Sequence, residues 1–158
     1  MPPKYVFTLV PGQYFRTRSV GFMEELTQGR LDAKHAYESL TSKARNIVDS
    51  RFKHWLDRQV FQKYFHRFDG VYSECFTFKW EERHIPQRLY GFLYHPKPKT
   101  DANFELCTLC YFDTKADKTN YTILKWINEL RVLPLVNFAI GQKYPELITD
   151  KSRKPWTQ

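Results

Sequence analysis

The spacing of apolar residues changes several times along this chain, and each change predicts a different element. Apolar and polar residues alternate loosely from Lys4 to Val10, which predicts a strand that ends at Pro11-Gly12. A short helix is predicted next, because Ser19 can act as an N-cap and apolar residues follow at three-residue spacing to Leu26. The Gln28-Gly29 step is expected to end this helix.

The clearest helical pattern follows Asp32, where apolar residues recur every three or four positions as far as Leu56. Whether this helix is continuous or interrupted near Ser39 to Ser42 stays open. The basic residues of the segment fall mostly off the apolar stripe and are expected to face solvent: Lys43, Arg45, Arg51, Lys53 and Arg58.

Beyond the turn signal Asp69-Gly70 the period changes to two, which predicts a strand over 71–80. One face of this strand would carry Tyr72, Phe76, Phe78 and Trp80, and the other Val71, Ser73, Cys75, Thr77 and Lys79. A second strand, Arg88 to His95, follows a loop with Pro86, and a third spans Phe104 to Phe112. Short connections between them predict an antiparallel meander.

A last helix is predicted with Thr119 as its N-cap and is expected to end before Pro134, and the following apolar stretch to Ile140 is expected to pack. The order strand, two helices, three strands, helix predicts an α+β fold in which the sheet buries one face against the helices. We expect one domain over residues 1–148 and a polar tail over 149–158.

The net charge of the chain indicates which kinds of partner it binds. It has 158 residues and a net charge of +8, with 25 Lys and Arg against 17 Asp and Glu, which favours nucleic acid, a ribosome or an acidic protein. Neither a long apolar run nor a signal peptide is found, and the three cysteines are odd in number, so we expect a cytoplasmic protein that does not contact a membrane. Nucleotide-binding and zinc-protease motifs are absent, so no cofactor or metal is predicted.

Three segments resemble the RelE/HigB/ParE superfamily of toxins from toxin–antitoxin systems: Phe68 to Cys75, Gln87 to Tyr94 and Leu106 to Lys118. In HigB-like members the same places read roughly as a Gly-turn with "LxELR", then "YRxxY", then an apolar strand that ends in a Lys-containing loop. The likeness covers about residues 40–131. Cys75-Phe76 stands where the family often has Leu-Arg or a similar basic residue, which puts the basic group at that place in doubt. The chain is also longer than is usual for the family, with extra residues at 133–158.

The resemblance implies a metal-independent endoribonuclease that cuts messenger RNA, usually on the ribosome. It assigns Arg88 to phosphate binding and gives Lys115 and Lys118 catalytic or RNA-binding roles, with Tyr121 beside them to stack on a base or assist proton transfer. It also implies a cognate antitoxin as partner, and a homodimer is an open possibility.

Other residues extend this candidate site. Lys79, Arg83 and His84 would form a basic patch at the first meander hairpin that could bind RNA, and His66 lies near a strand end where it could contribute. Cys107 and Cys110 form a C-x-x-C pair, but residues three apart on a strand point to opposite faces, so buried thiols are expected. Two alternatives stay open: a ParE-like gyrase inhibitor without catalysis, and a nucleic-acid-binding domain that does not cleave.

Overall fold

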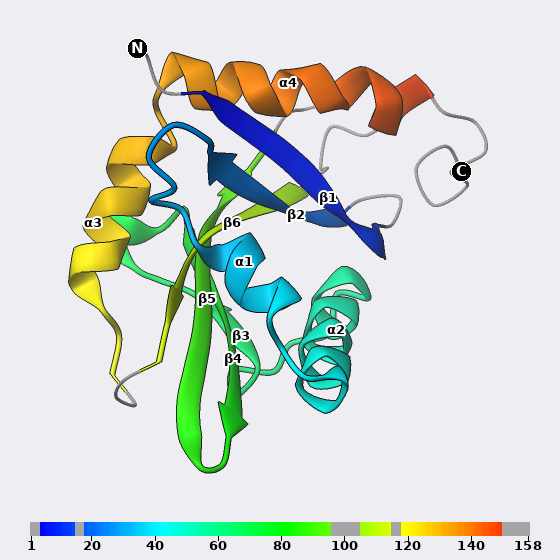
Figure 1. Ribbon diagram of the computed structural model, residues 1–158, viewed down its shortest axis with the longest axis vertical. Helices are drawn as coiled ribbons and strands as arrows, with labels where there is room; N and C mark the ends of the chain where they lie inside the picture. The colour runs from blue at the N-terminus through cyan, green and yellow to red at the C-terminus, as the bar shows by residue number, and fades with distance from the viewer. Residues whose placement is uncertain (1–3, 15–17, 96–104, 115–117, 150–158) are drawn as a thin grey trace.

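The computed structural model describes residues 4–14, 18–95, 105–114 and 118–149, and within them a six-stranded mixed sheet forms the centre of the molecule (Figure 1). The strands are β1 (Tyr5–Tyr14), β2 (Arg18–Glu25), β3 (Phe65–Arg67), β4 (Cys75–Glu82), β5 (Ile85–Tyr94) and β6 (Glu105–Asp113). The helices are α1 (Ala33–Glu38), α2 (Ser42–Leu56), α3 (Tyr121–Leu130) and α4 (Pro134–Thr149), with a 3₁₀ turn η1 (Gly70–Tyr72) before β4. The general α+β prediction is confirmed.

The strands lie in the order β1-β2-β6-β5-β4-β3. β4, β5 and β6 form the predicted antiparallel meander. β2 pairs with β6 in parallel, and the helices α1 and α2 and the strands β3, β4 and β5 lie between them in the sequence. β1 and β3 add antiparallel strands at the two edges of the sheet. The first predicted strand and the meander therefore belong to one continuous sheet.

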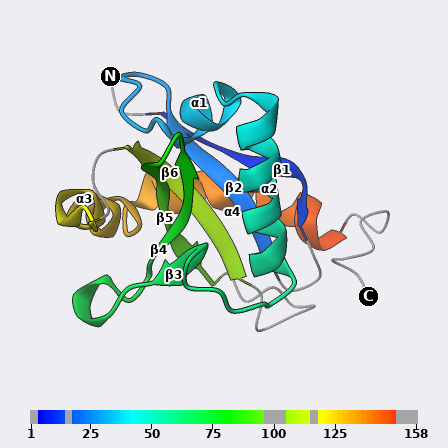
Figure 2. The ribbon, with the colours of Figure 1, turned by 90° about the horizontal axis from the view of Figure 1, so that it is seen from below.

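Helices cover both faces of this sheet, whereas the sequence predicted that only one face would be buried. Figure 2 shows α2 and α3 on opposite sides of the strands. The α2 side packs Val48, Phe52 and Trp55 against Phe76 and Phe78. The α3 side buries the apolar stripe of α3 and the inner residues of α4 against the other face: Ile123, Leu124, Ile127, Leu130, Val136, Ala139 and Ile140. Each of these Ile, Leu and Val side chains contributes about 1.5–3 kcal/mol by leaving water.

The helix predicted from Ser19 to Leu26 is wrong, because this segment forms β2. Val20 lies in the core on the α2 side and Met23 in the core on the α3 side, so the residues that a helix would place together point to opposite faces. β2 is flanked by β1 and β6 and covered on both faces, so residues 19–23 are all buried. The alternation of polar and apolar residues that marks a half-exposed strand is therefore missing. A Cβ on Gly21 would lie 2.2 Å from Phe7 Cζ, so the glycine permits the close approach of β1.

Three further boundaries differ from the prediction. β1 continues past Pro11-Gly12 to Tyr14 with a shift of register, which an edge strand tolerates because a missing donor can face away from the sheet. The three-residue strand β3 was not predicted. Pro86 lies inside β5 opposite Glu81 and not in a loop; β6 reaches only as far as Arg88, so no strand needs a donor from Pro86 on its outer side.

The faces of the first meander strand are correct only from Cys75 onward. Phe76, Phe78 and Trp80 lie on the α2 side and Cys75 on the α3 side, as predicted. Residues 71–74 precede the strand, and Tyr72 belongs to the 3₁₀ turn and packs on the α3 side.

The predicted long helix is interrupted within Ser39 to Ser42, so the interruption left open by the sequence is present. α2 starts after Thr41, whose side chain accepts a hydrogen bond from Ala44 N at 3.2 Å. α3 is capped by Asn120 and not by Thr119, because the side-chain Oδ1 of Asn120 accepts from Ile123 N at 3.3 Å.

The apolar stretch after Pro134 forms the buried start of α4, as expected. The predicted tail lies, beyond Thr149, outside the described residues. Within the described ranges, none of the helices has the length and apolar character needed to cross a bilayer.

Candidate functional site

Arg88, near the start of β5, lies at the centre of the candidate site. Its Cα is opposite Lys79 of β4 and Asp113 of β6, so these three side chains share one face of the sheet. This is the face covered by α3, because Tyr90, two positions along β5, is buried in the core on that side. Arg88 is only 7% exposed, and its Nη1 makes a long hydrogen bond of 3.5 Å to Thr119 Oγ1 just before α3.

His66 lies beside these cations on β3. Its Nδ1 is 2.8 Å from the carbonyl oxygen of Arg67. Because a carbonyl can only accept, this contact places the proton on Nδ1 and leaves Nε2 as the unprotonated nitrogen of the neutral ring. Burial lowers the pKa of His66 from its usual value, the Arg67 carbonyl opposes that effect, and the charges of Lys79 and Arg88 lower the pKa further. His66 is therefore neutral at pH 7 and able to accept a proton.

Aromatic rings complete this part of the surface. Tyr121, the first residue of α3, is 62% exposed, and its ring centroid lies 5.9 Å from that of Tyr72 in the 3₁₀ turn. Together they border a cavity of about 480 Å³, here called the α3-side hollow. It is lined by Gln62, His66, Arg67, Phe68, Asp69, Tyr72, Lys79, Thr119 and Tyr121. A neutral imidazole, an ammonium group and two phenol rings thus face one space.

A second cavity of about 560 Å³, the edge hollow, adjoins the first and shares Lys79 with it. It is lined by Ile47, Arg51, Lys63, Tyr64, Lys79, Trp80, Glu81, Pro86, Gln87 and Arg88. This hollow crosses the edge of the sheet, because β3 pairs with β4 only from Phe76 to Phe78 and leaves the rest of β4 uncovered by that strand. Residues from both faces can therefore line one cavity.

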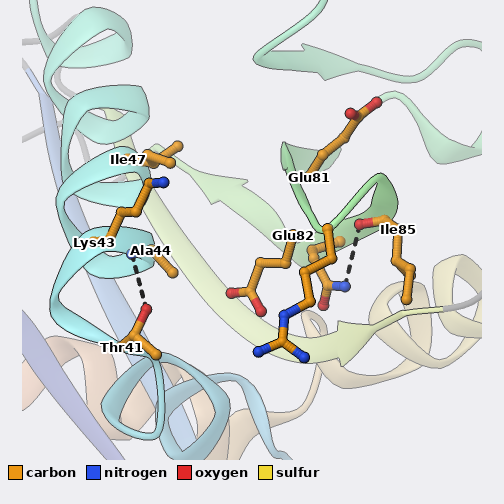
Figure 3. Close-up of a pocket in the computed structure, with 9 residues that line it drawn as sticks. Thr41, Lys43, Ala44, Ile47, Glu81, Glu82 and Ile85 are labelled. Atoms are coloured by element: carbon orange, nitrogen blue, oxygen red, sulfur yellow. Dashed lines mark hydrogen bonds between the residues drawn. The ribbon is translucent and has the colours of Figure 1, made fainter.

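A third cavity of about 510 Å³, the hairpin hollow, lies between α2 and the β4–β5 hairpin (Figure 3). Lys43 and Ile47 of α2 face Glu81 and Glu82 of β4 across it (Figure 3). It shares Ile47, Glu81 and Gln87 with the edge hollow. The three adjoining hollows are called the edge groove below.

Three of the eight residues singled out in the sequence line the α3-side hollow: Lys79, His66 and Tyr121. A fourth, Arg88, lies beside it, opposite Lys79 and in contact with Thr119. The four come from β5, β4, β3 and α3, so only the sheet brings them together. Lys118 is exposed and precedes Thr119, the residue that Arg88 contacts. Lys115 lies outside the described residues.

Arg83 and His84 occupy the opposite end of the edge groove from His66. Arg83 lines the hairpin hollow, and His84 is exposed beside it. They form the two-residue turn of the β4–β5 hairpin with φ of 51° and 66°, the left-handed conformation that such turns require and that glycine or asparagine usually supplies. The predicted patch with Lys79 is thus extended along the groove and is not a single cluster.

Sequence reasoning missed Arg51, Tyr64, Arg67 and Tyr72. Arg51 was expected to face solvent, but its guanidinium carbon lies 3.3 Å from the centre of the Tyr64 ring and its Nε donates to the carbonyl oxygen of Lys79 at 3.2 Å. The helical period gave no signal for this contact, because Tyr64 lies beyond the helix. The sequence did show an aromatic-rich segment at 61–72, which could have indicated a stacking surface.

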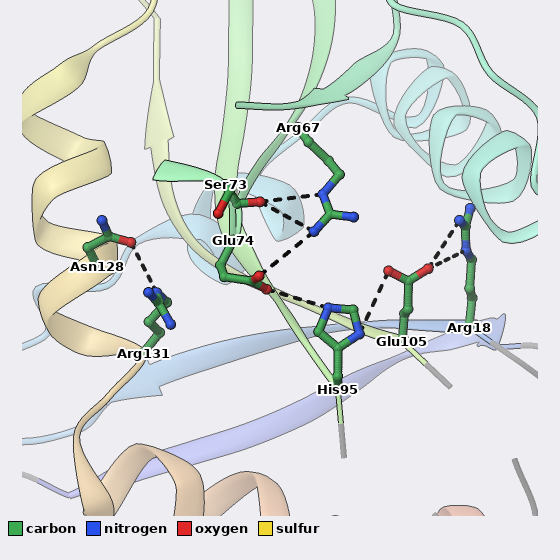
Figure 4. Close-up of polar contacts among 8 residues, drawn as sticks. All are labelled: Arg18, Arg67, Ser73, Glu74, His95, Glu105, Asn128 and Arg131. Carbon is green, nitrogen blue, oxygen red and sulfur yellow. Dashed lines mark hydrogen bonds and ion pairs between the residues drawn. The ribbon is translucent and has the colours of Figure 1, made fainter. Parts of the chain in front are cut away.

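Arg67 lines the α3-side hollow and lies at the end of a chain of arginine, glutamate and histidine side chains (Figure 4). Its guanidinium donates to the carbonyl oxygen of Ser73 at 3.3 Å and lies 3.9 Å from Glu74. His95 lies between Glu74, at 3.4 Å, and Glu105, at 3.9 Å (Figure 4). Arg18 ends the chain 3.1 Å from Glu105. The contacts with Ser73 and Glu74 position the Arg67 guanidinium.

The cysteines take no part in the site. Cys75, Cys107 and Cys110 are buried and unpaired with one another, and burial raises the pKa of all three thiols, that of Cys75 to about 11. Cys107 lies in the α2-side core and Cys110 in the α3-side core, which confirms that the C-x-x-C pair points to opposite faces. Among the described residues, no group of three His, Cys, Asp or Glu side chains could hold a metal ion.

No family model matches this chain, and neither a curated protein nor a solved structure shows significant similarity to it. Its function therefore has to be argued from the edge groove and its chemistry.

Proposed function

We propose that the chain is an endoribonuclease of the RelE/HigB toxin kind, which binds single-stranded messenger RNA in the edge groove and cleaves it at the α3-side hollow without a metal ion. The observation that carries the proposal is the meeting of Arg88, Lys79 and His66 beside Tyr121. RNA cleavage by its own 2′-hydroxyl needs a proton acceptor, a proton donor and cations at the phosphate, and single-stranded bases stack on aromatic rings.

The residues suggest how the reaction would proceed. His66 Nε2 takes the proton of the 2′-hydroxyl, and the 2′-oxygen forms a bond to the adjacent phosphorus. Lys79 and Arg88 stabilise the negative charge that builds on the phosphate oxygens. The bond from phosphorus to the 5′-oxygen breaks, and that oxygen takes a proton from the Tyr121 hydroxyl. The products are a 2′,3′-cyclic phosphate and a 5′-hydroxyl end.

The arrangement of elements supports the family assignment. Read from β2, the chain gives a strand, the helices α1 and α2, the meander β4-β5-β6 and the helix α3. This is the order that the resemblance implies, with β2 in place of the strand first expected at 4–10. β1, β3 and α4 would then be additions to the family plan. The ribosome and a cognate antitoxin remain part of the proposal.

A second candidate is a nucleic-acid-binding domain that does not cleave. The observation that favours it is the burial of Arg88, whose side chain contacts Thr119 and has little exposed surface. An arginine held in this way could support the fold of the groove while the exposed lysines bind phosphates. The two candidates differ in one outcome, the appearance of new RNA ends.

The test is an incubation of purified protein with 5′-labelled messenger RNA, either as free RNA in EDTA or on ribosomes in the magnesium that keeps them assembled. The proposal predicts fragments with cyclic phosphate ends, and it predicts that Arg88→Ala loses cleavage to a greater degree than binding. Lys53→Ala is the matched control, because Lys53 is exposed on α2 and lines none of the three hollows. Intact RNA that is nevertheless bound would support the second candidate.

A further inference from the structure

Two aromatic rings and a guanidinium group lie in contact beside the edge hollow, next to the proposed cleavage position. The ring centroids of Phe61 and Tyr64 lie 4.2 Å apart at 33°, and the guanidinium carbon of Arg51 lies 3.3 Å from the centre of the Tyr64 ring. The hydrogen bond from Arg51 Nε to the carbonyl oxygen of Lys79 holds the guanidinium plane. Guanidinium planes and aromatic faces are the surfaces on which unpaired nucleobases stack.

The charges of the edge hollow suit a polyanion. Four cations line it, Arg51, Lys63, Lys79 and Arg88, against one carboxylate, Glu81. Its volume of about 560 Å³ lies within the range of about 300–1,000 Å³ that is usual for small-molecule sites. A planar platform with an excess of positive charge fits a nucleotide better than an apolar peptide, because a nucleotide brings negative charge as well as a flat base.

The edge hollow also continues the proposed cleavage site. Lys79 lines both it and the α3-side hollow, and Arg88 lies between the two, in contact with Thr119 of one and lining the other. A phosphate held by these two side chains would therefore have one neighbouring nucleotide on each side. The α3-side hollow offers Tyr121 and Tyr72 to one base, and the edge hollow offers Arg51 to the other.

We propose that the edge hollow is a nucleobase subsite for single-stranded RNA, in which the base next to the bound phosphate stacks on Arg51, with Tyr64 behind it. This inference rests on the proposed function, since it takes the substrate to be RNA. Stacking accepts every base, so the subsite contributes affinity and fixes the phosphate without reading a sequence.

The test is an abasic scan. The probe is a dinucleotide with 2′-O-methyl riboses, which cannot be cleaved; its single phosphate fixes the register, and each of its two positions in turn lacks its base. Binding to the full chain is measured by fluorescence anisotropy. For the unmodified protein we expect two sensitive positions, each with a loss of about 5- to 100-fold, which is the value of one base stack.

Arg51→Lys keeps the positive charge and removes the plane. With this variant we expect intact RNA to bind about as weakly as the abasic probe binds to the unmodified protein, and one sensitive position to disappear. Tyr64→Phe keeps the stack and should keep both sensitive positions. Lys53→Gln removes a charge from α2 outside the groove and should also keep both.

The outcomes separate this inference from the proposed function. An unchanged two-position profile in Arg51→Lys, with the fold intact by thermal melting, would overturn the subsite while leaving RNA cleavage in place. Absence of RNA binding by the unmodified protein would overturn both. Loss of one sensitive position in Arg51→Lys but not in Tyr64→Phe or Lys53→Gln supports the subsite, even if no cleavage is found.

Discussion

Replacement of Arg88 by lysine separates the binding of RNA from its cleavage. The substitution keeps one positive charge on the α3-side face of β5 but removes the planar fork that can hold two phosphate oxygens at once. Loss of one preoriented donor to a developing anion costs about 10²- to 10³-fold in rate, or about 2.7–4 kcal/mol. We therefore expect Arg88→Lys to cleave about 100-fold more slowly.

Binding should respond much less. Affinity for RNA depends on the number of phosphates that are neutralised, and that number does not change when lysine replaces arginine. We expect the affinity of Arg88→Lys to fall by less than about fivefold, with the same slope of log affinity against log salt. Arg88→Ala should lower the slope by about one contact.

The assay is single-turnover cleavage of labelled RNA, with anisotropy titrations at several salt concentrations and a melting curve for each variant. The melting curve is needed because Arg88 is buried and contacts Thr119, so part of any effect could come from the fold. Equal rates for Arg88→Lys and the unmodified protein would refute the role given to the guanidinium fork. A fall in affinity as large as the fall in rate would show that Arg88 only binds.

Four other predictions concern His66, Gly91 and the cysteines. Because burial lowers the pKa of His66, cleavage should already be maximal at pH 7 and should decline only below about pH 6.5, and His66→Gln should abolish this pH dependence in a rate profile. The unfolded chain binds more protons than the folded chain below that pH, so stability should fall there, and His66→Gln should reduce the fall in denaturant titrations. Gly91→Ala should destabilise the sheet by at least about 3 kcal/mol, since the new Cβ would lie 2.0 Å from the carbonyl oxygen of Thr108; an unchanged denaturation midpoint would contradict the packing of β5 on β6. Cys75, Cys107 and Cys110 should resist thiol reagents in the native protein and react after unfolding, and rapid native labelling would show that the cores on the two faces are open.

The sequence predicted those elements whose burial follows one regular period. The stripe of α3 has a single partner surface, so period and position agree, and β4 shows a period of two because its large aromatic residues all lie on the α2 side. β2 was mistaken for a helix because strands and helices beside it cover both its faces and both its edges, so residues 19–23 are all buried and no alternation of exposed positions sets a period of two. β3 has three residues, too few for any period.

The candidate site was only partly accessible to sequence reasoning for a similar reason. Arg88, Lys79 and His66 could be chosen one at a time from local chemistry and family resemblance. The three side chains come close together only because β3, β4 and β5 pair in the observed register, which their separate sequences do not show. Arg51 was missed because a helical pattern shows only which side of the helix faces the core. It does not show that an aromatic residue beyond the helix, such as Tyr64, covers a side chain on the opposite side.

The most direct test of the edge groove as an RNA site is photocrosslinking with RNA that carries 4-thiouridine, followed by peptide mapping. We expect crosslinks on the segments that border the groove, at residues 61–72 and 118–121, and their loss when Lys79 and Arg88 are both replaced by alanine. Crosslinks confined to the exposed apolar residues of α3 and α4, such as Trp126 and Phe138, would contradict the account.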